Sequence, residues 1–193
     1  DNNIELPGSI SKEQLETDPS VANAGSLNRN SQRDFDLYRF ALQHSIPLVN
    51  GGKADFGASF QNVEMFHPLP FALLRSDEDN AAISARVQQK LGSNHSLGYG
   101  GLASWGQSTN PRFRFAGTTG ANQGTQSRDE SNDAAGLELF IQDSVALNDS
   151  LDFIAGTQLV YARRENTTTN IDASGIRTAL ADRSADYTGF SPR

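Results

Sequence analysis

The stretch from Ala134 to Tyr161 alternates apolar and polar residues on both sides of a short polar break, and this pattern leaves few folds open. Most odd-numbered positions are apolar, and most even-numbered positions are polar or glycine. Because a strand points successive side chains to opposite faces, the pattern predicts a hairpin with one apolar face. If Ala146 pairs with Ser150, paired positions sum to 296 and the apolar rows coincide. A slip of one residue would scatter them.

A second hairpin is predicted earlier in the chain. Strands at 34–48 and from Lys53 onward flank the turn 50–52, where glycines supply positive φ. Pairing positions that sum to 102 places Phe56 opposite Ile46 and Phe60 opposite Leu42. The apolar faces coincide again, although His44 interrupts the row.

The rest of the chain predicts further strands at 80–91 and 96–106, separated by polar stretches. We interpret 63–79, 107–132 and 163–185 as long connections, the first because its prolines lack the donor that a central ladder needs. Residues 1–33 are expected to form a solvated, extracellular-loop-like segment, in which Ser11 and Gln14 fit the capping box of a single helical turn. Residues 34–193 then supply about six complete strands and the start of a seventh at Tyr187. We interpret the chain as a fragment.

These strands are long enough to cross a bilayer. A tilted transmembrane strand needs about 9–11 residues, and a closed antiparallel ladder is the only sheet that lipid tolerates. Short turns at one end, long loops at the other, and one apolar and one polar face are typical of an outer-membrane barrel. We therefore expect an all-β fold, an antiparallel up-and-down meander that is part of a large transmembrane β-barrel. The residues expected to face lipid, with an aromatic girdle of Tyr38, Phe60, Trp105 and Tyr161 among them, are Tyr38, Phe40, Leu42, Phe56, Phe60, Ile83, Val87, Trp105, Leu137, Leu139, Ile141, Phe153, Leu159 and Tyr161.

A soluble fold remains open at this point. The same alternation is expected of a secreted all-β binding domain of lectin or adhesin type, in which the apolar face would be covered by a core. In a barrel, the face of the strands that points inward would also carry apolar residues, namely Leu102, Phe140, Ile154 and Val160. Something that fills the barrel would have to cover them.

Composition excludes several functions. The formal net charge is −7 and the acidic residues are spread along the chain, which argues against duplex nucleic acid as a partner. The chain has no cysteine, and its three histidines lack the spacing of a metal site. No nucleophile elbow or dinucleotide loop is present. We expect neither an enzyme nor a cofactor.

Arginines in the polar stretches are the candidates for ligand capture. Arg112 and Arg114 flank Phe113, and guanidinium groups bind carboxylate or catecholate-type anions through paired hydrogen bonds. Arg163 and Arg164 could join them. Binding of lipopolysaccharide phosphate, or simple solvation of the loops, would explain the same arginines.

Three segments resemble one known family. The run GLELFIQDS at 136–144, followed by LDFIAGTQ at 151–158, resembles a strand, short turn, strand segment of TonB-dependent outer-membrane receptors. The segment DYTGFSPR at 186–193 is similar to the start of that family's next strand, and ELPG at 5–8 to an upstream extracellular loop. The resemblance covers most of the chain.

The resemblance implies a fold and a function. The family's barrel has about 22 strands and is closed by an N-terminal plug domain. It imports ferric siderophores, haem, cobalamin or similar nutrients with force transmitted by TonB. By this resemblance the chain is part of the middle of such a barrel in the bacterial outer membrane. Its expected partners are outer-membrane lipid, a ferric siderophore or related chelate, and the TonB complex through a plug absent from this chain.

Overall fold

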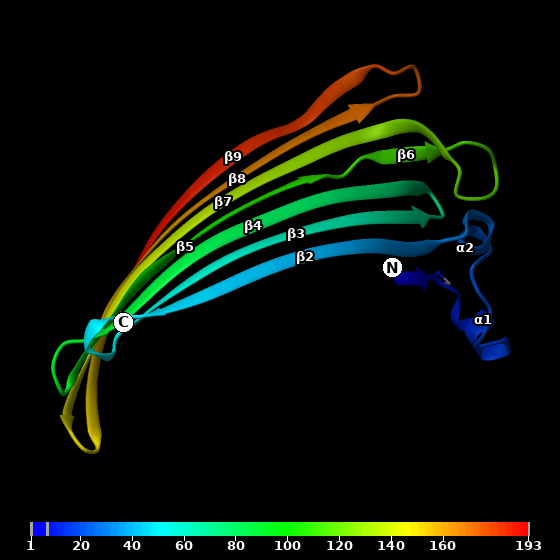
Figure 1. Cartoon of the computed structure of the whole chain (residues 1–193). Helices are drawn as coiled ribbons and strands as arrows, with labels where there is room; N and C mark the ends of the chain where they lie inside the picture. Colours follow the sequence, from blue (N-terminus) through cyan, green and yellow to red (C-terminus); the bar gives the residue numbers. More distant parts are fainter. Residues whose placement is uncertain (1, 7, 193) are drawn as a thin grey trace.

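The computed structural model describes residues 2–6 and 8–192 of the chain. Pro7 and Arg193, which belong to the segments similar to the family, lie outside the described residues. The described chain forms one antiparallel sheet that curves strongly along its strands (Figure 1). The predicted all-β class and up-and-down order are therefore confirmed.

Strands that neighbour one another in sequence pair with one another in space. Within the described residues the sheet order is β1-β2-β3-β4-β5-β7-β8-β9, and short β6 pairs with β4 and β7. The strand bounds are β1 Asn2–Glu5, β2 Gln32–Pro47, β3 Lys53–Leu69, β4 Ala72–Lys90, β5 His95–Thr109, β6 Arg112–Phe115, β7 Gln123–Asn148, β8 Leu151–Ile171 and β9 Arg177–Pro192.

The N-terminal segment is more ordered than a solvated loop. It contains β1, which pairs with the start of β2, and two short helices, α1 Lys12–Thr17 and α2 Ala24–Arg29. The predicted capping box is confirmed. The Ser11 hydroxyl accepts from the backbone N–H of Gln14, and the Gln14 side-chain oxygen accepts from the backbone N–H of Ser11. Asn23 caps α2 by accepting from the amides of Gly25 and Ser26.

The predicted long connections are wrong. The stretches 63–79, 107–132 and 163–185 are mostly strand, and the ladders continue through them. β3 and β4 are joined by Pro70 and Phe71 alone, and β8 and β9 by residues 172–176. Backbone pairing does not depend on apolar side chains, so strands continue where both faces are polar. The end of the apolar alternation therefore marked the end of the apolar band and not the end of the strand.

Pro68 is accommodated because it lies beyond the end of one ladder. In β3 it stands opposite Leu73, while the pairing of β3 with β2 stops at the Asp34–Phe66 pair. In a hairpin with a two-residue loop the closing pair, here Leu69 and Ala72, exchanges hydrogen bonds, so the next residue directs its nitrogen toward the other neighbour. At Pro68 no strand partner stands on that side, and the missing donor costs the ladder nothing.

Both predicted registers are shifted by two residues. β2 and β3 pair at positions that sum to 100, so Phe56 faces His44 and Phe60 faces Phe40. The intervening loop is longer than predicted, because the Leu48 amide donates to the Gly52 carbonyl at 2.8 Å around a 3₁₀ turn. β7 and β8 pair at positions that sum to 298, with a bulge at Leu147. A shift of two keeps every side chain on its predicted face.

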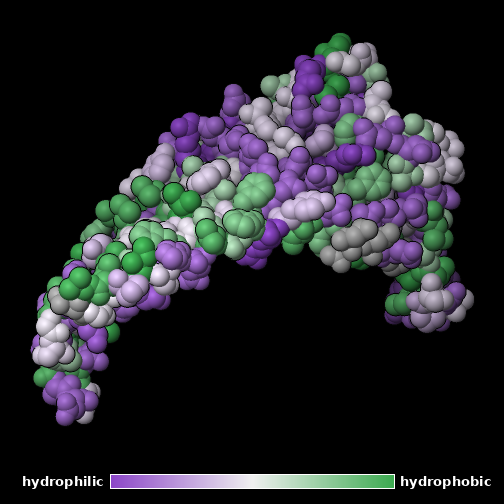
Figure 2. All heavy atoms as spheres, in the orientation of Figure 1, coloured by the Kyte–Doolittle hydropathy of each residue, from purple (hydrophilic) through white to green (hydrophobic). Residues whose placement is uncertain are grey.

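Few side chains are buried. The buried apolar side chains among the described residues are Ala54, Pro68, Ala72, Leu73 and Ile171, whereas most large apolar side chains along the sheet are exposed. In Figure 2 hydrophobic residues gather mainly over the half of the sheet nearer the β2–β3, β4–β5 and β7–β8 turns, and the half nearer α2 is largely hydrophilic. Neither described helix has the length and apolar character needed to cross a membrane.

Candidate functional site

The apolar positions of the long strands form one continuous face, which we call the apolar face, and the opposite side is the polar face. One row across the sheet joins Leu42, Ala58, Ile83, Ala103, Leu137 and Tyr161. The register places all the residues predicted to face lipid on this face. Each of them is exposed, between 39% and 64%, except Val87, which is half-buried.

The apolar face ends sharply toward the α2 end of the sheet. The row that contains Tyr38 continues only with polar and charged residues, namely Asn62, Asp79, Gln107, Asp133 and Glu165. The next row is polar throughout and consists of Asp36, Glu64, Asp77, Thr109, Ser131 and Thr167. The band of apolar residues is therefore bounded by a charged margin.

This margin crosses the strands obliquely. On the apolar face, the outermost aromatic residue of β2 is Tyr38, and its row reaches β8 at Glu165. The outermost aromatic residue of β8 is Tyr161, four residues nearer the short turns. At about 3.4 Å per residue, these four residues span ~14 Å along the strand. At about 4.8 Å between neighbouring strands, β2 and β8 are ~24 Å apart across the sheet, so the margin is tilted by ~30°. On β8 the band runs eight residues from Tyr161 to Phe153, or ~27 Å. Both values are close to those of transmembrane barrels.

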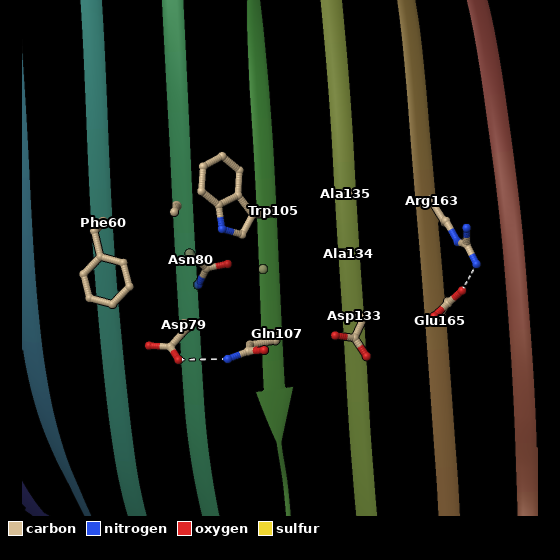
Figure 3. A pocket seen from close by; sticks show the side chains of 12 residues that line it. Phe60, Asp79, Asn80, Trp105, Gln107, Asp133, Ala134, Ala135, Arg163 and Glu165 are labelled. Atoms are coloured by element: carbon tan, nitrogen blue, oxygen red, sulfur yellow. Dashed lines mark hydrogen bonds and ion pairs between the residues drawn. The ribbon is translucent and has the colours of Figure 1, made fainter.

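A shallow groove marks the margin between the strands. It has a volume of about 340 Å³, and its floor carries the small residues Ala81 and Ala135 on either side of Trp105. Figure 3 shows Asp79 accepting from Gln107 at 3.1 Å on one side of the groove and Arg163 paired with Glu165 on the other. Aromatic, small apolar and charged groups therefore meet within one groove.

Two histidines lie on the apolar face. His44 is exposed opposite Phe56, inside the apolar band. His95 lies near the short turns, and its Nε2 is 2.6 Å from a carboxylate oxygen of Asp143, which lies on the same face. No cluster of three or more potential metal ligands occurs within residues 2–6 and 8–192.

Apolar residues on the polar face are partly covered by their neighbours. Leu102, Phe140 and Val160 are half-buried, and Ile154 is 56% exposed. The Phe140 ring lies across Gly100, since a Cβ added to Gly100 would stand 3.1 Å from Phe140 Cε1. The absence of a side chain at Gly100 therefore makes room for this ring.

Above the apolar band, a chain of side-chain hydrogen bonds ties four strands together on the polar face. Asn132 of β7 donates to Ser108 of β5 at 3.2 Å and accepts from Asn166 of β8 at 2.7 Å. Asn110 donates to Ser108 at 3.0 Å and accepts from Ser76 of β4 at 2.7 Å. These bonds hold the polar halves of the strands in register.

The structure separates the predicted ligand-binding arginines. Arg112 lies on the polar face, while Phe113 pairs with the fully buried Leu73 on the apolar face. The Arg114 guanidinium donates to the carbonyls of Gln126 at 3.1 Å and Ile171 at 2.8 Å, so it fastens β6 to β7 and β8.

Arg163 and Arg164 point to opposite faces of β8. Arg163 lies on the apolar face, paired with Glu165, whereas Arg164 is exposed on the polar face. Arg164 is six residues along β8 from Asn170, which faces Arg128. Arg163 is therefore not brought together with the other predicted residues.

Two further arginines lie beside β6 or its following loop, and no sequence pattern distinguishes them. Arg128 of β7 stands directly opposite Arg112, and Arg29 of α2 contacts the loop between β6 and β7. Both were missed because the pairing of β6 with β7 and the docking of α2 join segments that are distant or polar in the sequence. No local signal would have found them.

The β8–β9 turn next to Arg114 is held by one carboxylate. Asp172 accepts from the Ser174 hydroxyl at 2.6 Å and from the Ile176 amide at 3.0 Å. These donors favour the charged form and lower the pKa of Asp172, with the Ser174 hydroxyl contributing most. The Asp172 carbonyl in turn accepts from Arg114 at 3.4 Å, so the turn and β6 support each other.

Comparison with known proteins adds one match. The sequence model of a family described as "TonB dependent receptor-like, beta-barrel" matches residues 4–193. No curated protein matches the chain.

Proposed function

Because this chain belongs to the TonB-dependent receptor β-barrel family, we propose that it is part of a receptor that takes up a ferric siderophore or a similar metal chelate. The family consists of non-enzymatic transporters of the bacterial outer membrane, and membership implies interaction with TonB. This membership decides against the soluble lectin-like or adhesin-like domain that the sequence alone left open. The match over nearly the whole chain is the observation that carries the proposal.

The apolar face contacts lipid in this proposal. Its exposed side chains, its oblique margin and its ~27 Å length along β8 support this, because a barrel's lipid-facing band is about 25 Å tall and its strands are tilted. Burying an apolar face of this size in water-free surroundings removes the aggregation hazard that it would present in solution. The groove beside Trp105 then lies at the level of the lipid headgroups.

The polar strand ends beyond the charged margin set the orientation of the chain in the membrane. Barrels of this kind have short periplasmic turns and longer extracellular parts, so the extended polar ends of β3, β4, β7 and β8 project outside the cell. We also propose that residues 1–33 form an extracellular segment and residues 34–193 the barrel part. The contact of α2 with the β6–β7 loop supports that placement.

The polar face is the ligand side in this proposal. It carries Arg39, Arg112, Arg128 and Arg164, whose guanidiniums suit an anionic chelate. The partly covered Leu102, Phe140 and Val160 lie lower on this face, where a plug domain would contact them.

Uptake by whole cells tests the proposal. Gram-negative cells that produce the receptor containing this chain would be given radioactive iron as the citrate, a tris-catecholate or a hydroxamate complex. We expect at least one complex to accumulate, and accumulation to stop when TonB is removed. Accumulation of none of them in cells with active TonB would contradict a ferric chelate as the cargo.

A further inference from the structure

Arg112 of β6 and Arg128 of β7 stand directly opposite each other on the polar face. The next pair is Phe113 with Gln126, so Ser127 is an extra residue in β7 and makes a bulge beside the two arginines. The Ser127 hydroxyl donates to the Arg112 carbonyl at 3.2 Å, and Gln126 donates to the Arg128 carbonyl at 3.3 Å. The backbones that carry the two arginines are therefore held in place on both strands.

The two positive charges of this pair are only partly matched by acids, because one carboxylate lies beside them. Like charges directly opposite each other in a sheet repel. Among the described residues, Arg128 has one carboxylate nearby, Glu130 at 3.5 Å, while the Arg112 side chain has no hydrogen bond or ion pair. The Nε atoms of both arginines are buried without a partner. The flanking residues add no negative charge, since Arg112 faces Leu74 of β4 and Arg128 faces Asn170 of β8.

Arg114 shows how a structural arginine is satisfied in the same strand. Its guanidinium donates to three backbone carbonyls, those of Gln126, Ile171 and Asp172. Arg112, two residues away, makes no such bond and remains half-buried. A role limited to holding the strands together therefore accounts for Arg114 and not for the pair.

We propose that Arg112 and Arg128 together bind an oxyanion group of the transported ligand, of carboxylate or phosphate type. This site rests on the proposed transport function and names the part of the ligand that it would recognise. Two planar guanidiniums on adjacent strands can each give paired hydrogen bonds to one multiply charged oxyanion, and the anion removes the repulsion between them. The Asn170 amide is placed to add a further donor from β8.

Anion binding can be measured without iron or TonB. The purified full-length receptor in detergent would be titrated with inorganic phosphate in a calorimeter, with chloride at equal ionic strength as the reference and citrate as a second probe. We expect R112Q and R128Q each to weaken phosphate binding about tenfold or more, because each removes a charge-assisted bond. R86Q removes an exposed arginine on the same face, twelve residues along β4 from the Leu74 that faces Arg112, and should leave phosphate binding unchanged.

Unfolding gives a second measurement if a variant binds poorly for other reasons. Without phosphate, the double variant R112Q/R128Q should unfold at a temperature no lower than the unchanged receptor, because it loses repulsion and no protein contact but the weak one to Glu130. Three results would each overturn the site. The double variant could bind phosphate as well as the unchanged receptor, the unchanged receptor could show no phosphate-specific binding, or the double variant could unfold at a clearly lower temperature. Phosphate binding to the purified receptor that R112Q and R128Q weaken, together with no accumulation of any ferric chelate by cells, would keep the site and reject the iron cargo.

Discussion

The guanidinium of Arg29 in α2 lies over the ring of Phe115 in β6, with 4.2 Å between Cζ and the ring centroid. The same guanidinium donates to the carbonyl of Gly117 at 3.1 Å, and the Gly120 amide donates to the Asn28 carbonyl at 2.6 Å. A helix near the start of the chain is thereby fastened to the loop between β6 and β7. In the membrane orientation proposed above, both lie on the extracellular side.

Replacing Arg29 should loosen both segments together. In R29Q the stacking at this half-buried site, about 0.5–2 kcal/mol, and the bonds to the Gly117 and Gly120 carbonyls are lost. We expect faster amide hydrogen exchange in residues 24–31 and in 116–122, measured by mass spectrometry on the full-length receptor. R183Q, at an exposed arginine of β9, is the matched control. Faster exchange in only one of the two segments would show that Arg29 does not connect them.

A charge on the apolar face should be costly, and the same charge on the polar face should not. Leu139 is exposed on the apolar face opposite Leu159. L139R should destabilise the intact barrel by about 2–4 kcal/mol, the cost of Arg near the bilayer midplane. Q158R lies on the polar face, where Gln158 already bonds Glu138 at 3.1 Å, and should have a much smaller effect. Reversible denaturant unfolding in lipid vesicles measures both. Equal effects of the two variants would argue against lipid contact at Leu139.

Gly100 should tolerate no side chain, although Gly98 in the same strand and on the same face should. A Cβ at Gly100 would lie 2.3 Å from the Ala85 carbonyl oxygen and 2.9 Å from Arg86 Cα, so the β4 backbone would have to move. At Gly98 the nearest atom is 3.9 Å away. We expect G100A to cost about 1–3 kcal/mol, as overpacking usually does, and G98A to cost much less. A smaller loss of unfolding free energy in G100A than in G98A would show that this contact is absent.

The sequence of residues 34–161 was sufficient to predict the two faces of the sheet. The alternation of side chains in a strand is a local property, so residues such as Leu139 and Phe56 reached their predicted face even though both hairpin registers were shifted by two residues. The same pattern, with its length and its aromatic residues, pointed to the outer membrane that the family match supports.

The sequence alone could not predict how far the strands extend or which residues meet across them. Polar residues give the same local pattern in a loop as in a strand exposed to water on both faces, so the sequence does not distinguish the hydrogen-bonded ends of β3, β7 and β8 from loops. The pairing of Arg112 with Arg128 and the contact of Arg29 with Phe115 depend on register and docking. These are set by backbone bonds between distant segments, and so only the tertiary structure decided them.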